Sequence, residues 1–199
     1  MSRARVLTLL ALTVVGASTG CASDATTATT ELPTCATSDQ TASNGVVLMA
    51  QSVPTASWVP CLRTTLPLGW TFQHLDARNG ISRFWLNSDR DGQKAIEVRL
   101  EESCTTAGST EIHSDREGMR RLERVTMTTP QFHGERYYVF PGGCITFVFR
   151  LGGDSDNRGE PLALATQAVG AVSRADLLKQ VHDESGGRLS LDPPSAGGR

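Results

Sequence analysis

Two arginines, a histidine and two tyrosines near residue 130 are the residues of this chain best suited to binding chemistry. They are Arg121, His133, Arg136, Tyr137 and Tyr138. A guanidinium group pairs with carboxylates and phosphates, and an aromatic ring attracts cations, so together they can hold a carboxylate, a phosphate or a glycan. If residues 119–128 and 135–140 form a hairpin, some of these side chains share one face of a sheet. The pattern predicts a binding face; the alternative is a solvated face on which arginines pair with nearby glutamates.

Each of the four histidines is followed two residues later by an acid. On a strand such a pair shares a face, and a carboxylate beside an imidazole raises its pKa, as a general base requires. His133 with Glu135 is the pair nearest the predicted binding face. Two of the histidines fall in predicted loops and one at a helix end, which favours ordinary surface positions. We therefore assign no catalytic residue, and an extracytoplasmic hydrolase is an alternative only.

The first twenty residues have the pattern of a secretory signal peptide. Arg3 and Arg5 precede the apolar or small run VLTLLALTVVGA, and three small residues then lead to Cys21. The run is shorter than the roughly 20 residues that a membrane-spanning helix needs. We expect residues 1–20 to be removed.

Thr19, Gly20 and Cys21 resemble the lipobox of bacterial lipoproteins, although Ser18 departs from the leucine preferred there. The resemblance covers residues 1–21 only. It implies a diacylglyceryl group on the sulfur of Cys21, cleavage before this residue, and a position on the outer side of the cell membrane. Two acyl chains hold a protein on a bilayer, whereas one holds it weakly. The alternative is an ordinary signal peptide with a chance cysteine.

Four further cysteines follow the predicted anchor: Cys35, Cys61, Cys104 and Cys144. An even number in an exported protein indicates two disulfides, for which three pairings are open. We favour Cys35–Cys61, which would attach the N-terminal segment to the domain, and Cys104–Cys144, which would join two predicted strands. The spacings C-x-x-C and H-x3-H are absent, so we predict no metal site and no other cofactor.

Charge and composition divide the chain and restrict its partners. Removal of residues 1–20 changes the formal net charge from −2 to about −4, which gives no basic excess for binding nucleic acid. Residues 21–34 are the lipidated cysteine and a flexible tether rich in alanine, threonine and serine. Residues 35–185 form a single globular domain, and residues 186–199 a disordered tail.

Alternating residues and tight turns predict an antiparallel sheet. The turns Asn79-Gly80 and 89–92 separate the first three strands, and residues 95–101 alternate Ile96, Val98 and Leu100 toward the core with charged residues toward water. Residues 119–128, which also have helical spacing, are predicted as a strand. Residues 136–140 and 144–151 are further strands.

The predicted fold class is α+β: an antiparallel sheet of five or six strands, with C-terminal helices on one face and two disulfides. A helix starting at Pro161 is expected to carry its apolar stripe to Val172, and a second helix starts after Ser173. The proline-broken segment 44–70 is expected to be irregular, with Trp58 and Trp70 in the core.

These features favour a non-catalytic binding or accessory module on the membrane surface. Its partners would be the membrane, through the lipid anchor, and an envelope protein or small ligand. The alternatives are the hydrolase and an assembly subunit of a membrane complex.

Overall fold

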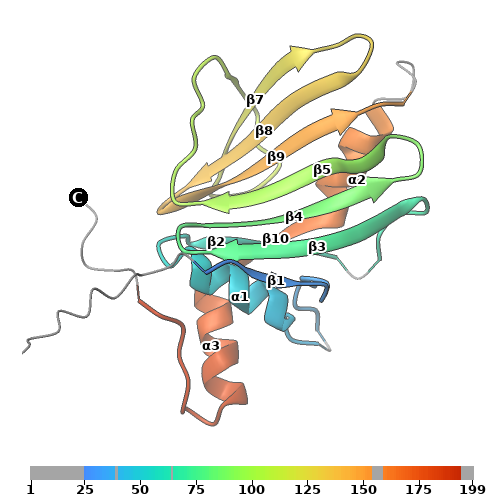
Figure 1. Cartoon of the computed structure of the whole chain (residues 1–199). Coiled ribbons are helices and arrows are strands. Elements are labelled where there is room, and N and C mark those ends of the chain that lie inside the picture. The colour runs from blue at the N-terminus through green and yellow to red at the C-terminus, as the bar shows by residue number, and fades with distance from the viewer. Residues whose placement is uncertain (1–24, 39, 64, 154–158, 194–199) are drawn as a thin grey trace, which may run out of the picture.

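The computed structural model describes residues 25–38, 40–63, 65–153 and 159–193, and most of these form one large antiparallel sheet. The predicted signal peptide, Cys21 and the end of the predicted tail lie outside the described residues. The spatial order of the sheet is β1-β3-β4-β5-β9-β8-β7-β6 (Figure 1). Its strands are β1 (Thr27–Thr29), β3 (Trp70–Arg78), β4 (Ile81–Ser88), β5 (Gly92–Glu101), β6 (Thr110–Ile112), β7 (Arg120–Met127), β8 (Phe132–Phe140) and β9 (Gly143–Leu151). The other elements are α1 (Asn44–Ser52), β2 (Trp58–Leu62), α2 (Gly159–Ala168), β10 (Val169–Ser173) and α3 (Arg174–Glu184).

The turn residues explain the hairpins at the centre of the sheet. Gly80 and Gly92 have positive φ angles of 81° and 98°, which glycine adopts without steric cost. They join β3 to β4 and β4 to β5, as the sequence predicts. The ambiguous segment 119–128 is also a strand, because β7 pairs with β8 along its length.

The sheet is larger than the predicted five or six strands. β1 comes from the predicted flexible tether and pairs with residues 75–77 of β3, and β6 comes from a polar loop and pairs with β7. Both are three-residue edge strands, too short and too polar to show an alternating pattern in the sequence. Residues 25–34 are therefore attached to the sheet instead of being a free tether.

A second layer covers one face of the large sheet. The antiparallel pair β2–β10 lies behind the large sheet in Figure 1, where β2 contacts β5 and β9, and α1 contacts β3 and β4. The C-terminal helices α2 and α3 adjoin the two ends of β10. Leu177 of α3 is buried in the core, and Leu162 of α2 packs against it. We call the covered face the inner face and the opposite one the outer face.

The inner face carries the main core. Ile96, Val98, Phe147 and Phe149, which alternate with outward residues in β5 and β9, are at most 2% exposed. Burial of each such side chain contributes about 1.5–3 kcal/mol before the cost of ordering the chain. This alternation confirms the predicted orientation of both strands.

The segment predicted to be irregular begins with a helix. In α1, Val46, Met49, Ala50 and the following Val53 are all fully buried, at the i, i+3, i+4, i+7 spacing of one helical face. The prolines that suggested an irregular chain start only at Pro54, after the helix. Trp58 and Trp70 are partly buried and pack against the core.

The predicted helix from Pro161 to Val172 ends early. α2 stops at Ala168, and Val169 to Ser173 form β10 instead. A Cβ atom on Gly170 would lie 3.0 Å from the sulfur of Cys35, so glycine allows this strand to pass close to a disulfide. The second helix is confirmed: the side chain of Ser173 accepts a hydrogen bond from the backbone N–H of Asp176.

Both favoured disulfide pairs are present. Cys35–Cys61 joins the N-terminal segment to β2, with 4.9 Å between the Cα atoms. Cys104–Cys144 joins the loop after β5 to β9, with 6.1 Å between the Cα atoms. Of Cys104 and Cys144, only Cys144 lies in a strand, whereas the sequence predicts that both do.

The start of the predicted disordered tail packs on the body. Leu191 is 3% exposed in the core, and the backbone of Asp192 bonds to Gln51 and Arg174. Residues 186–193 are therefore not the disordered segment that the sequence predicts.

Candidate binding face

The five residues predicted to form one binding face lie on two faces of the sheet. Successive side chains of a strand point to opposite sides, so Tyr137 and Tyr138 diverge. Tyr138 and Arg136 lie on the inner face with Arg121, which is opposite Tyr138 in β7. Tyr137 and His133 lie on the outer face. The prediction of a single face containing all five is therefore wrong, because both members of an adjacent pair were assigned to it.

The three inner residues belong to an ion-pair network at the end of the sheet. Glu123 accepts hydrogen bonds from Arg121 Nη2 at 2.6 Å and from Arg136 Nε at 2.5 Å. Tyr138 donates its hydroxyl to Asp115 at 2.8 Å, and Asp115 also pairs with Arg121. Burial alone would raise the pKa of Glu123, but the two arginines outweigh it and lower the pKa. These bonds indicate a structural role for Arg121, Arg136 and Tyr138.

On the outer face, Tyr137 belongs to a second cluster. Its hydroxyl donates to Glu135 Oε2 at 2.7 Å, and Arg124 donates to the same oxygen. Burial and then the neighbouring Glu135 raise the pKa of Tyr137 to about 12, so the phenol stays protonated at neutral pH. His133 is opposite Arg150 of β9. The predicted partner of His133, Glu135, is thus bonded to Arg124 and Tyr137.

Glu97 is an acid buried on the outer face, although the sequence predicts that it faces water. It is 3% exposed and accepts hydrogen bonds from Arg99 at 2.7 Å and Arg150 at 3.3 Å. Burial works to raise the pKa of Glu97, and the bonds and charges of the two arginines lower it overall. Trp85 and Val148 lie beside Glu97 on the neighbouring strands.

Trp85 is the aromatic centre of the outer face. The guanidinium of Arg83 is 5.1 Å from its ring and the ammonium of Lys94 is 4.9 Å away, both within cation–π range. The ring of His74 lies 4.5 Å from it. Trp85 is only 5% exposed, yet long side chains cover it instead of another layer of main chain.

His74 also forms the one ion pair seen, within the described residues, among the four histidine–acid pairs. Its Nε2 lies 3.6 Å from Asp76 Oδ1. Arg83 approaches the other carboxylate oxygen of Asp76 at 3.9 Å. His74 therefore shares Asp76 with Arg83, one of the cations around Trp85. The sequence analysis had favoured a different histidine, His133.

A hollow of about 170 Å³ lies on the outer face near the second disulfide. Burial raises the pKa of Glu101 in this hollow, where the charges of Arg99 and Arg83 only partly oppose the effect. Adjacent charged groups are bonded to each other, so the hollow is a polar surface depression. It is lined by Arg99, Glu101, Arg124, Glu135, Tyr137 and Thr146, among others.

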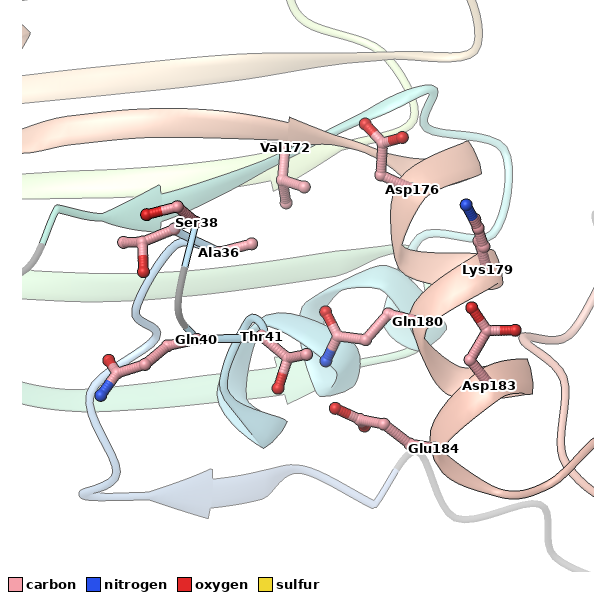
Figure 2. A pocket seen from close by; sticks show the side chains of 11 residues that line it. Ala36, Ser38, Gln40, Thr41, Val172, Asp176, Lys179, Gln180, Asp183 and Glu184 are labelled. Carbon is pink, nitrogen blue, oxygen red and sulfur yellow. The ribbon is translucent and has the colours of Figure 1, made fainter.

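A larger cavity of about 440 Å³ lies elsewhere, between the 36–41 segment and α3. In Figure 2, Gln180 and Glu184 point from α3 toward this segment. Gln180 bonds both backbone groups of Ala42, and Asp176 is bonded to Ser173 at the start of α3. These side chains hold the N-terminal segment against α3. The packing of the N-terminal segment against α3 therefore accounts for this cavity.

Two kinds of feature are absent from the described residues. They contain no helix of the length and apolarity needed to cross a bilayer. They also contain no group of three or more histidine, cysteine, aspartate or glutamate side chains placed to hold a metal ion.

No protein family, curated protein or solved structure matches this chain. The outer face is therefore assessed on its own geometry. Sequence reasoning missed Trp85, Arg83 and Glu97. The 89–92 turn does not predict the pairing of Trp85 with Glu97, because the register between β4 and β5 shifts between Leu86 and Ser88. The signal that the sequence did hold is the alternation of β5, which places Glu97 on the face opposite to Ile96 and Val98.

Proposed function

We propose that this protein is a lipid-anchored binding module that acts on the outer side of the cell membrane and holds its partner on the outer face of the sheet. The observation that carries the proposal is that partly exposed cationic side chains, instead of main chain, cover Trp85 and Glu97 on this face. Arg83 and Arg150 are 41% and 46% exposed, and they lie above or beside Trp85 and Glu97. A partner can displace such side chains, whereas it cannot displace a packed strand.

The charges indicate the chemistry of the partner. Arg83 and Arg150 each share an acid with a second basic side chain, since Asp76 also faces His74 and Glu97 also faces Arg99. An anionic group on the partner would complete these pairings and keep Arg83 bonded when it leaves the tryptophan. We therefore propose an envelope protein or ligand that presents acidic groups beside a flat surface.

The position of β1 supports an anchor close to the domain. Thr27 is paired with Ala77 at the sheet edge and lies six positions after Cys21. Six extended residues span at most about 20 Å. A lipid on Cys21 would hold this edge of the sheet close to the bilayer.

Photo-crosslinking in the native host tests the binding face. A photoreactive residue at Arg150 should give a discrete crosslinked product, and one at Leu178 on α3, which is 44% exposed, should not. Equal products at both positions, or none at Arg150, would refute the outer face as the binding surface.

Mass spectrometry of the N-terminal peptide tests the anchor separately. We expect a diacylglyceryl thioether on Cys21, and we expect Cys21→Ala to leave the membrane fraction or to stay unprocessed. A full-length chain with a free thiol would refute the anchor but not the binding face.

A further inference from the structure

In the part of the chain that the structure describes, one edge of the small sheet is open. There β10 pairs with β2 only, and the bonds from Arg63 N to Ala168 O and from Arg174 N to Ser57 O fix the register. Antiparallel residues alternate between pairs that exchange hydrogen bonds and pairs that do not. Ala171 is opposite Pro60, which has no N–H, so this is a pair without mutual bonds. The N–H and C=O of Ala171 therefore point away from β2.

Arg116 bonds to this same edge. Its Nη2 donates to the carbonyl of Val169 at 2.6 Å, and its guanidinium lies 4.4 Å from the ring of Tyr138. The second terminal nitrogen, Nη1, is buried and has no hydrogen-bond partner within the described residues. A buried cationic N–H without an acceptor is costly, and it marks a place where a ligand oxygen would be stabilised.

A cleft of about 240 Å³ opens at this point, on the inner side of the sheet. It is lined by Trp58 and Met119, by Ala171, and by the cations Arg63 and Arg116. Arg63, Gly170 and Ala171 also line an adjoining hollow of about 390 Å³, so the open space continues along β10.

The charges of the cleft favour an anion. Arg63 and Arg116 face it together. Burial lowers the pKa of Arg116, and the charge of Arg63 acts in the same direction, although Tyr138 and Asp115 oppose the shift. Two acids also line the cleft, but Asp115 is already bonded to Tyr138 and Arg121. The exposed Glu117 is therefore the one lining acid left to offset the positive charges of Arg63 and Arg116.

We propose that this cleft binds an extended peptide carrying a carboxylate, which adds to the free edge of β10. The peptide backbone would bond to the N–H and C=O of Ala171, as in strand addition to a sheet edge. Its carboxylate would accept from Arg116 Nη1 and from Arg63, and an apolar side chain would contact Trp58 and Met119. This site lies across the sheet from the outer face, so its failure would leave the proposed function unaffected.

Hydrogen exchange measures the proposed backbone contact directly. The full-length protein in a neutral detergent would be screened with acetylated hexapeptides of mixed sequence, one set with a free C-terminal carboxylate and a matched set ending in a carboxamide. We expect binders in the carboxylate set, and exchange at the Ala171 amide slowed at least about tenfold on binding. The amides of Gly170 and Val172, which face β2, should change little. The absence of binders, equal binding by the carboxamide set, or an unchanged Ala171 amide would each overturn the proposal.

A matched pair of variants tests the carboxylate contact. Arg63→Gln removes an exposed cation from the cleft and should weaken the selected peptide about tenfold or more. Arg150→Gln makes the same charge change on the outer face and should leave peptide affinity unchanged. Equal affinity of Arg63→Gln and the unmodified protein would refute the contact. A concentration-dependent dimer that the peptide does not dissociate would instead assign the edge to a second copy of the chain and overturn the proposal.

Discussion

The two faces of the large sheet are both shielded from water, but by different means. The inner face is covered by β2, β10 and α1, so its residues pack against main chain and neighbouring apolar groups. On the outer face, Trp85 and Glu97 are each at most 5% exposed although no helix or strand of the described residues lies over them. Arginine and lysine side chains provide their cover. Burial by itself therefore does not distinguish a core from a surface that a partner can open.

Replacement of one aromatic residue on each face should show the largest difference. Phe147→Ala, on the inner face, should lower the free energy of unfolding by about 3–5 kcal/mol, because packed main chain cannot close the cavity. Trp85→Ala should cost less than half as much, because the side chains above it can settle into the space, but it should remove the crosslinked product at Arg150. Urea unfolding of both variants measures the difference. Equal destabilisation would show that the outer face is also a rigid core.

The disulfides allow a second comparison, because one lies in each layer. Loss of either bond should cost about 2–4 kcal/mol in unfolding free energy. Their local effects should differ: Cys35→Ser with Cys61→Ser should let a protease cut within residues 33–42, which Cys35 ties to β2, and Cys104→Ser with Cys144→Ser should not. Limited proteolysis followed by mass spectrometry would identify the cleavage sites. The same early cleavage in both double variants would contradict this division.

Two glutamates of the same strand and the same face should respond in opposite ways. Glu97→Gln should lower the unfolding free energy at pH 7 by about 1.5–3 kcal/mol, because Arg99 and Arg150 lose their shared charge. Glu101→Gln should leave stability unchanged or increase it, because burial raises the pKa of Glu101 and its ionised form is disfavoured.

The pH dependence gives the sign of each effect. The pKa of Glu97 is lowered in the folded protein, so its contribution is present above the unfolded pKa and is lost as the pH falls through the folded pKa. The penalty of Glu97→Gln should therefore shrink in acid. The pKa of Glu101 is raised, so Glu101 lowers stability as the pH rises through its folded pKa, and the benefit of Glu101→Gln should grow in that direction. A penalty for Glu97→Gln that is independent of pH would exclude the ion pairs as its source.

The adjacent tyrosines should give the smallest difference. Tyr138→Phe should cost about 1–2 kcal/mol, because a buried hydroxyl loses a charged acceptor, Asp115. Tyr137→Phe should cost less, because Arg124 continues to bond Glu135. Thermal unfolding of the two variants would rank them, and a larger loss for Tyr137→Phe would reverse the assignment of the two clusters.

Strand identity could be predicted wherever a strand is long and its partner is near in the sequence. The alternation of Ile96 and Val98 and the turns at Gly80 and Gly92 are local properties, and they predicted β3 to β5. The three-residue strands β1 and β6 could not be found in this way, because their pairing depends on edges formed by other strands. α1 was missed for a different reason: its helical spacing was present, but the prolines after it dominated the interpretation.

The residue types of the candidate face could be predicted from the sequence, but which residues share that face could not. The sequence contains arginine and tyrosine residues close together, yet the alternation of a strand separates Tyr137 from Tyr138. The position of Trp85 beside Glu97 could be known only from the register between β4 and β5. β10 required a partner, β2, more than a hundred residues earlier in the chain.

The sequence by itself determined the alternation of the long strands, their tight turns and an even set of cysteines suited to two disulfides. These follow from backbone sterics and the two-residue period of a strand, which act over a few residues. Only the tertiary structure decided which face is covered by main chain, that Glu97 is buried between two arginines, and that one edge of β10 stays open. Those outcomes depend on segments far apart in the chain competing for the same surface, and no local pattern records the result of that competition.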